Sequence, residues 1–184
     1  MAIKTFTTGE VLTASDTNNF LANSGFQYIN NGTFSNAASV DVTGFSSLFD
    51  FYQLTFAVRK HTAGVCDVTA QLFSGATVRN TQYYGASRFA AFDATVGFAA
   101  NRSNGTNFYV LSTGNANTSM MDAMVHGVDD GEFVINLQGY DTANSRAIYG
   151  SYSNYAASSS FTLIRFTGTA NITGYWNVAG MRKS

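Results

Sequence analysis

Strict alternation of apolar and polar residues is the clearest pattern in the chain. In Phe51–Arg59 one face of an extended strand would carry Tyr52, Leu54, Phe56 and Val58. The segment Val65–Phe73 repeats the pattern, with an apolar face formed by Cys66, Val68, Ala70 and Leu72. This alternation predicts strands of a sheet that is buried on one side only. The intervening Lys60–Gly64 predicts a hairpin or a sandwich corner.

Similar short segments continue to the end of the chain, at intervals of about 8 to 12 residues. Turn-forming Gly, Asn, Asp and Ser residues separate them, and the chain contains no proline. The predicted strands lie around Ala38–Thr43, Thr81–Tyr84, Phe89–Ala99, Phe108–Ser112, Met120–His126, Phe133–Leu137, Arg146–Tyr152, Phe161–Phe166 and Ile172–Gly180. We therefore predict an all-β fold, a jelly-roll-like antiparallel β-sandwich.

The first thirty residues follow a different pattern. Residues 3–8 alternate as a short extended arm would, and Ser15 and Asp16 are good helix N-cap residues. The apolar spacing that follows predicts a short helix from about Asp16 to Tyr28. Asn30-Asn31-Gly32 predicts a turn. The expected division is an N-terminal arm with a short helix over residues 1–31, and a β-sandwich over 32–184. The helix either caps its own β-domain or forms a hook that docks on a neighbouring protein.

Composition suggests a protein that works by assembly. Charged residues make up 11% of the chain against about 25% in ordinary globular proteins, and aromatic residues make up 15%. Aromatic residues are enriched and charges depleted in the core of protein interfaces. A net charge of −1 argues against broad binding to nucleic acid or anionic membranes. No stretch reaches the ~18 apolar residues of a membrane span, so membrane insertion is not expected. The start of the chain does not resemble a secretion signal, which predicts synthesis in a cytosol.

No constellation of residues predicts catalysis, a cofactor or a metal. His61 and His126 lack the spacing of zinc ligands, and Cys66 in its strand is expected to be a small buried apolar residue. Asp129-Asp130-Gly131-Glu132 fits a hairpin turn better than a calcium loop. No G-x-S-x-G motif occurs. We expect neither enzymatic activity nor a bound cofactor.

Aromatic residues offer one alternative to a purely structural role, because aromatic faces can stack on the apolar faces of sugars. The structural interpretation of the same residues is that they are buried in the core or in a subunit interface. The candidates for a sugar-binding platform are Tyr83, Tyr84, Tyr149, Tyr152, Tyr155 and Trp176.

Three segments resemble small structural proteins of tailed bacteriophages. Lys4–Phe20, with Gly9-Glu10-Val11-Leu12-Thr13-Ala14-Ser15-Asp16-Thr17-Asn18-Asn19-Phe20, resembles their GE-x-LTASD-x-N-x-F opening motif. Phe49–Leu54 looks like a strand start that recurs among them. Gly168–Lys183 looks like their closing strand, although Tyr175–Gly180 departs from the family pattern.

The resemblance implies a component of a virion, typically trimeric. It implies a capsid decoration or cement protein that binds the major capsid protein and stabilises the shell. The alternative is a tail-fibre module that binds a receptor or a host-surface glycan. In either case the opening motif would be the docking segment, with contacts from Glu10, Leu12, Asp16, Asn19 and Phe20.

Overall fold

The computed structural model describes residues 7–11, 13, 25–60, 62, 64–91, 96–127, 132–154 and 160–183, with the backbone alone for 91 and 96–104. In these ranges the regular elements are all strands: β1 (Phe26–Thr43), β2 (Phe49–Lys60), β3 (Cys66–Ser74), β4 (Thr77–Arg79), β5 (Tyr83–Ala91), β6 (Val96–Gly105), β7 (Phe108–Thr113), β8 (Ser119–His126), β9 (Phe133–Asp141), β10 (Arg146–Asn154) and β11 (Leu163–Arg182). Within these ranges no helix is long and apolar enough to cross a membrane.

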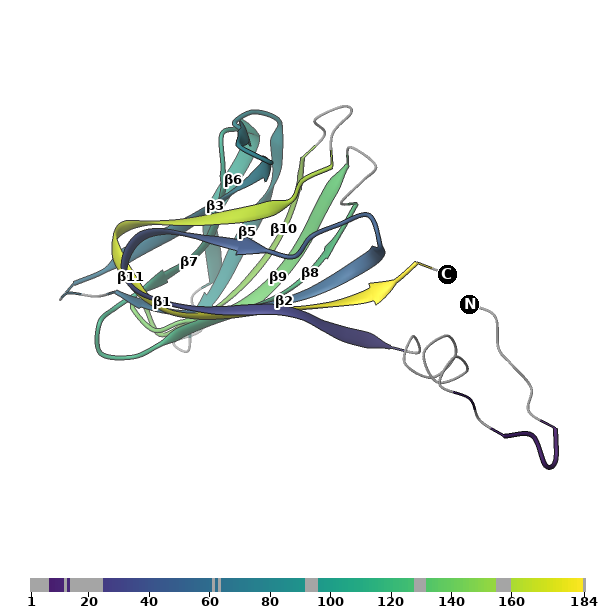
Figure 1. Cartoon of the computed structure of the whole chain (residues 1–184). Coiled ribbons are helices and arrows are strands. Elements are labelled where there is room, and N and C mark those ends of the chain that lie inside the picture. Colours follow the sequence, from purple (N-terminus) through teal and green to yellow (C-terminus); the bar gives the residue numbers. More distant parts are fainter. Residues whose placement is uncertain are drawn as a thin grey trace.

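One antiparallel sheet curls over on itself to make two layers (Figure 1). Its strand order is β4-β3-β11-β2-β8-β9-β10-β5-β6, and β1 and β7 pair with β11 and β3. The long β11 connects the layers, because its first part pairs with β3 and its second part with β2. β1 follows β11 along the other edge over nearly its whole length. The predicted all-β class and antiparallel pairing are confirmed.

The core lies between the two layers and is rich in aromatic rings. The predicted inward faces of β2 and β3 are confirmed, since the apolar residues named above for both strands are buried, Cys66 among them. Phe56 and Phe166 stack with ring centroids 4.2 Å apart. Every residue of β7 is buried, because this strand lies inside the curl. Burial of these apolar surfaces supplies the main stabilising free energy of the domain.

The predicted helix is wrong in the part that the structure describes. Phe26–Tyr28 begins β1 and pairs with β11, with Phe26 opposite Met181 and Tyr28 opposite Ala179. Pairing with a distant strand outweighs a helix preference that Asn and Gly residues already make weak. The rest of that segment, residues 16–24, lies outside the described residues.

The predicted turn at Asn30-Asn31-Gly32 is also strand, because β1 continues through it. Gly32 lies opposite Trp176, and a Cβ atom there would come within 2.8 Å of the indole ring. The glycine therefore makes room for a core aromatic residue. The division of the chain at residue 31 remains a prediction.

Two further connections refine the predicted strand map. The strands expected at Phe161–Phe166 and Ile172–Gly180 are parts of the single strand β11. β2 and β3 pair with different parts of β11 and not with each other, so of the two connections predicted between them the hairpin is wrong. Residues 61 and 63 of this connection lie outside the described residues. The expected hairpin between β8 and β9 is confirmed.

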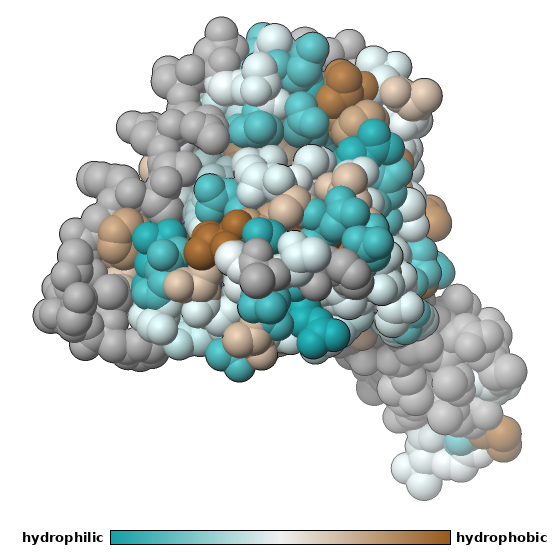
Figure 2. All heavy atoms as spheres, turned by 90° about the vertical axis from the view of Figure 1, so that its left-hand side faces the viewer, coloured by the Kyte–Doolittle hydropathy of each residue, from teal (hydrophilic) through white to brown (hydrophobic). Residues whose placement is uncertain are grey.

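One side of the surface is mostly hydrophilic or neutral. On the side that Figure 2 shows, apolar residues of the described part form small separate spots among hydrophilic and neutral ones.

Candidate functional site

A continuous row of polar side chains crosses the outer face of the larger layer. Residues that face each other on neighbouring antiparallel strands project from the same side of the sheet. The strand register therefore aligns Arg88, Tyr149, Gln138, Asp122, Thr55, Asn177 and Asn31 across seven strands. We call these residues the polar row.

The rows on either side of it mix amides with methionine and tyrosine. The row on one side consists of Ala86, Ser151, Asn136, Met124, Gln53, Ala179 and Tyr28. The row on the other side consists of Ala147, Tyr140, Met120, Ala57, Tyr175 and Thr33. This face thus presents hydrogen-bonding groups and exposed apolar surface side by side.

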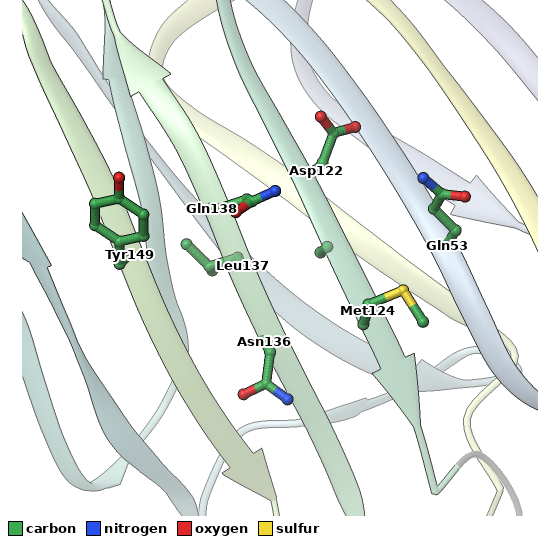
Figure 3. A pocket seen from close by; sticks show the side chains of 8 residues that line it. Gln53, Asp122, Met124, Asn136, Leu137, Gln138 and Tyr149 are labelled. Atoms are coloured by element: carbon green, nitrogen blue, oxygen red, sulfur yellow. The ribbon is translucent and has the colours of Figure 1, made fainter.

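Three shallow hollows on this face meet at Tyr149. The first, of about 320 Å³, is lined by Gln53, Asp122, Ala123, Met124, Asn136, Leu137, Gln138 and Tyr149 (Figure 3). The second, of about 300 Å³, extends over β5 and includes Ser87, Arg88 and Ser151. The third, of about 270 Å³, includes Met120 and Tyr140. Because Tyr149 lines all three, we treat them as one groove.

Small and apolar residues beneath the groove keep it open. Leu137 and Ala123 form part of its floor and belong to the core. Gly139 lets β8 and β9 approach closely, because a Cβ atom there would lie 2.5 Å from the carbonyl oxygen of Met120. Leu137 lies between two polar residues of β9, Asn136 and Gln138. Their side chains therefore project outward from a tightly paired strand.

The side chains of the groove suit a ligand rich in hydroxyl groups. Asp122 accepts a hydrogen bond of 2.6 Å from Thr55 Oγ1, which orients its carboxylate. The amides of Gln53 and Gln138 can each donate and accept hydrogen bonds. Tyr149 is 48% exposed and offers both an aromatic ring and a hydroxyl group. A few placed polar groups around an apolar surface are typical of small-molecule binding sites.

The structure divides the aromatic residues that sequence reasoning proposed as a sugar platform. Tyr83, Tyr152 and Trp176 are buried in the core. The hydroxyl of Tyr83 donates to the Arg79 carbonyl oxygen and accepts from the Leu72 amide, and burial raises its pKa to about 12. Tyr84 and Tyr149 are exposed, and Tyr155 lies outside the described residues.

Sequence reasoning missed the amides and the carboxylate of the groove. Their only signal is that they occupy the polar positions of alternating strands, which is equally typical of any solvated face. The strand register that aligns them is a property of the folded sheet.

Of the predicted docking residues, the structure describes Glu10. It closes an exposed turn, in which its amide donates to the Thr7 carbonyl oxygen at 3.0 Å and its carboxylate accepts from the Thr7 amide at 3.1 Å. The other four, Leu12, Asp16, Asn19 and Phe20, lie outside the described residues. The docking role of this segment remains a prediction.

A second exposed surface lies along the same face, at the end where β1 begins. The strand register aligns Phe26, Met181, Phe51, His126 and Val134 there. The Phe51 and His126 rings lie 5.5 Å apart, and Leu48 nearby is also exposed. We call this surface the apolar end. Across the described ranges, no three or more His, Cys, Asp or Glu side chains gather as a metal site would require.

Comparisons with known proteins give distant likenesses in structure. No protein-family model and no curated protein matches the chain. Galectin LEC-6 from Caenorhabditis elegans is similar at 10% identity and a TM-score of 0.37, over 79% of this chain and 94% of that chain. The PL-14 alginate lyase from Aplysia kurodai is similar at 9% identity and a TM-score of 0.39, over 83% and 82%. The CBM2 module of the evolved Dit of Lactobacillus casei BL23 phage J-1 is similar at 11% identity and a TM-score of 0.22, over 84% and 77%. At these values the likeness does not extend to function.

Proposed function

We propose that this chain is a structural protein of a bacteriophage virion whose β-domain binds a glycan in the groove around Tyr149. The groove supports the proposal of glycan binding, because Asp122, Gln53 and Gln138 line it together with the exposed Tyr149. The virion part is supported by the resemblance of Lys4–Phe20 to phage structural proteins and by the low charge of the chain.

The groove is shallow and open, so a single copy should bind weakly. Affinity on a cell surface would come from several copies that engage several glycans together. Linked sites raise overall avidity by factors of about 10² to 10⁴ without any new contact. The trimer expected for such virion proteins would supply this multivalency.

Glycan binding is tested with the purified full chain on an array of bacterial surface oligosaccharides, followed by calorimetry on the best ligand. We expect Tyr149→Ala to weaken binding about tenfold or more, which corresponds to about 1.4 kcal/mol. Tyr175→Ala is the matched control, since Tyr175 is a similarly exposed tyrosine of the same face that does not line the groove. Glycan binding by the groove would be refuted if no oligosaccharide bound, or if both substitutions weakened binding equally.

The apolar end supports capsid decoration as a second candidate function. Phe26, Phe51 and Leu48 expose apolar surface of the kind that protein interfaces bury. A decoration protein would use such a surface on the capsid or on a neighbouring copy. Binding only to the assembled shell would stabilise it by mass action.

Electron cryo-microscopy of virions separates the two candidates. Density for this protein on the tail, with the groove pointing outward, supports the glycan-binding function. Density at the symmetry axes of the capsid, with the apolar end buried against the shell or between copies, supports decoration instead.

A further inference from the structure

The charges in the groove differ between its two ends. Among the described residues that line its hollows, Asp122 and Arg88 are the only ones with charged side chains. Asp122 lines the first and third hollows, whereas Arg88 lines the second. Tyr149 belongs to all three and lies between these two charges in the polar row.

The two charges are far enough apart to act on different parts of a ligand. Asp122 on β8 and Arg88 on β5 are separated by three strand steps, through β9 and β10. Neighbouring strands lie about 4.8 Å apart, so the separation is roughly 14 Å. This exceeds the screening length of about 8 Å at physiological salt, so each charge acts mainly on its own surroundings.

Each end favours a different chemical group. Arg88 is exposed, and a guanidinium group can hold a carboxylate with two parallel hydrogen bonds. Ser151 lines the same hollow, is exposed and adds a hydroxyl group. Asp122 repels an anion at the other end, but accepts hydrogen bonds from sugar hydroxyls.

We infer that the groove binds an acidic oligosaccharide in one direction. A sugar that carries a carboxylate lies at Arg88, a sugar ring stacks on Tyr149, and an uncharged, hydroxyl-rich sugar lies at Asp122. This inference rests on the proposed glycan-binding function and adds to it the ligand class and its orientation.

The test uses matched pairs of oligosaccharides, each pair consisting of a carboxylate-bearing compound and its carboxyl-reduced, neutral counterpart. Calorimetry with the full chain should show that the acidic member binds about two- to fivefold more tightly, the upper part of the range for one exposed ion pair. In Arg88→Gln the ratio of the two affinities should fall towards one. In Asp122→Asn both affinities should fall together and their ratio should stay the same, because Asp122 contacts the uncharged sugar that the two members share.

Arg59→Gln is the matched control, because Arg59 is an exposed arginine of β2 that does not line the groove. It should leave the affinity ratio unchanged. A sulfated version of each oligosaccharide separates recognition of a carboxylate from recognition of any anion, and equal binding of sulfate and carboxylate would refute the carboxylate assignment.

The outcomes separate this inference from the function on which it rests. If neither member of any pair binds, the proposed function itself is wrong. If both members bind equally and Arg88→Gln does not change the ratio, glycan binding stands and the charge-directed orientation is wrong. An equal loss of preference in Arg59→Gln would likewise contradict the role of Arg88.

Discussion

Two tyrosines of β10 show how position within one strand decides the role of a residue. Tyr149 and Tyr152 project to opposite faces, so that Tyr149 is 48% exposed and Tyr152 is 1% exposed. The Tyr152 hydroxyl donates to Ser87 Oγ at 2.9 Å inside the core. One ring is available to a ligand, whereas the other packs in the core against Phe108 of β7.

We therefore expect removal of the Tyr152 ring to lower stability much more than removal of the Tyr149 ring. Tyr152→Ala should lower the free energy of unfolding by about 3 to 5 kcal/mol, because it leaves a cavity and removes a buried hydrogen bond. Tyr149→Ala should change it by less than about 0.5 kcal/mol. Urea unfolding followed by fluorescence measures both. A large loss of stability in Tyr149→Ala would show that its ring is part of the packed structure.

Tyr83 should make the fold sensitive to alkali. Burial favours the neutral phenol in the folded state and raises its pKa to about 12, against about 10 in the unfolded chain. The unfolded state therefore loses its proton first as the pH rises. The contribution to stability is complete below about pH 10 and is lost as the pH rises to about 12.

The pH dependence of urea unfolding between pH 9 and 12 tests this expectation. Tyr83→Phe should flatten the fall in stability over this range, although it lowers stability at neutral pH by removing two buried hydrogen bonds. Tyr84→Phe, at an exposed position of the same strand, should leave the slope unchanged. An unchanged slope in Tyr83→Phe would contradict the assignment.

At the scale of elements, the hairpin between β9 and β10 depends on one buried carboxylate. Asp141 accepts hydrogen bonds from the amides of Ala143 and Asn144, from the Asn144 side chain and from Arg146 Nε at 2.8 Å. The Asp141 side chain is fully buried, and that of Arg146 is only 16% exposed. The carboxylate thus fixes the turn that leads into the strand carrying Tyr149.

Asp141→Ala should destabilise the protein by about 3 to 5 kcal/mol, because it leaves a largely buried arginine without its charged partner. The matched control is Asp41→Ala. Asp41 pairs with Arg165 between β1 and β11 through two hydrogen bonds, but both side chains are more than a third exposed. Solvent screening limits the contribution of that pair to the free energy of unfolding to less than about 1 kcal/mol. Thermal unfolding of both variants compares the two pairs, and equal losses would contradict this ranking.

The strands were largely predictable from sequence, whereas their partners were not. The alternation of Tyr52, Leu54, Phe56 and Val58 identified both β2 and its buried face. The start of β1 was misjudged because its strand state depends on pairing with the far end of the chain. Likewise the sequence around Gly32 is typical of a turn. In the structure this glycine lies in a strand, where the Trp176 ring occupies the space that a side chain would need.

At the scale of the whole molecule, the groove exists only because five strands adopt one register. Gln53, Asp122, Gln138, Tyr149 and Arg88 each come from a different strand, and a shift by one residue would turn any of them inward. Of these five, sequence reasoning singled out Tyr149 alone, by its aromatic character.

Oligomeric state is the remaining prediction at this scale. We expect the purified chain to form a trimer, with the apolar end as the contact, because Phe26, Phe51 and Leu48 would otherwise remain in water. Light scattering after size exclusion measures the mass of the particle. Phe51→Ser should shift it to monomer, while Tyr175→Ser, an exposed aromatic residue outside the apolar end, should not. A monomer of the unmodified chain at micromolar concentration would contradict the expectation.

The pairing of β1 with β11 has a consequence for the time that folding takes. Asp41 and Arg165 meet although 124 positions separate them along the chain, and β11 completes the edges of both β2 and β3. Closing so long a loop is entropically unfavourable, and chains dominated by such distant contacts fold in milliseconds to seconds. Until that closure both neighbouring strands expose unpaired edges, which can pair with other copies. Newly made chains are therefore most prone to aggregate before their two ends have met.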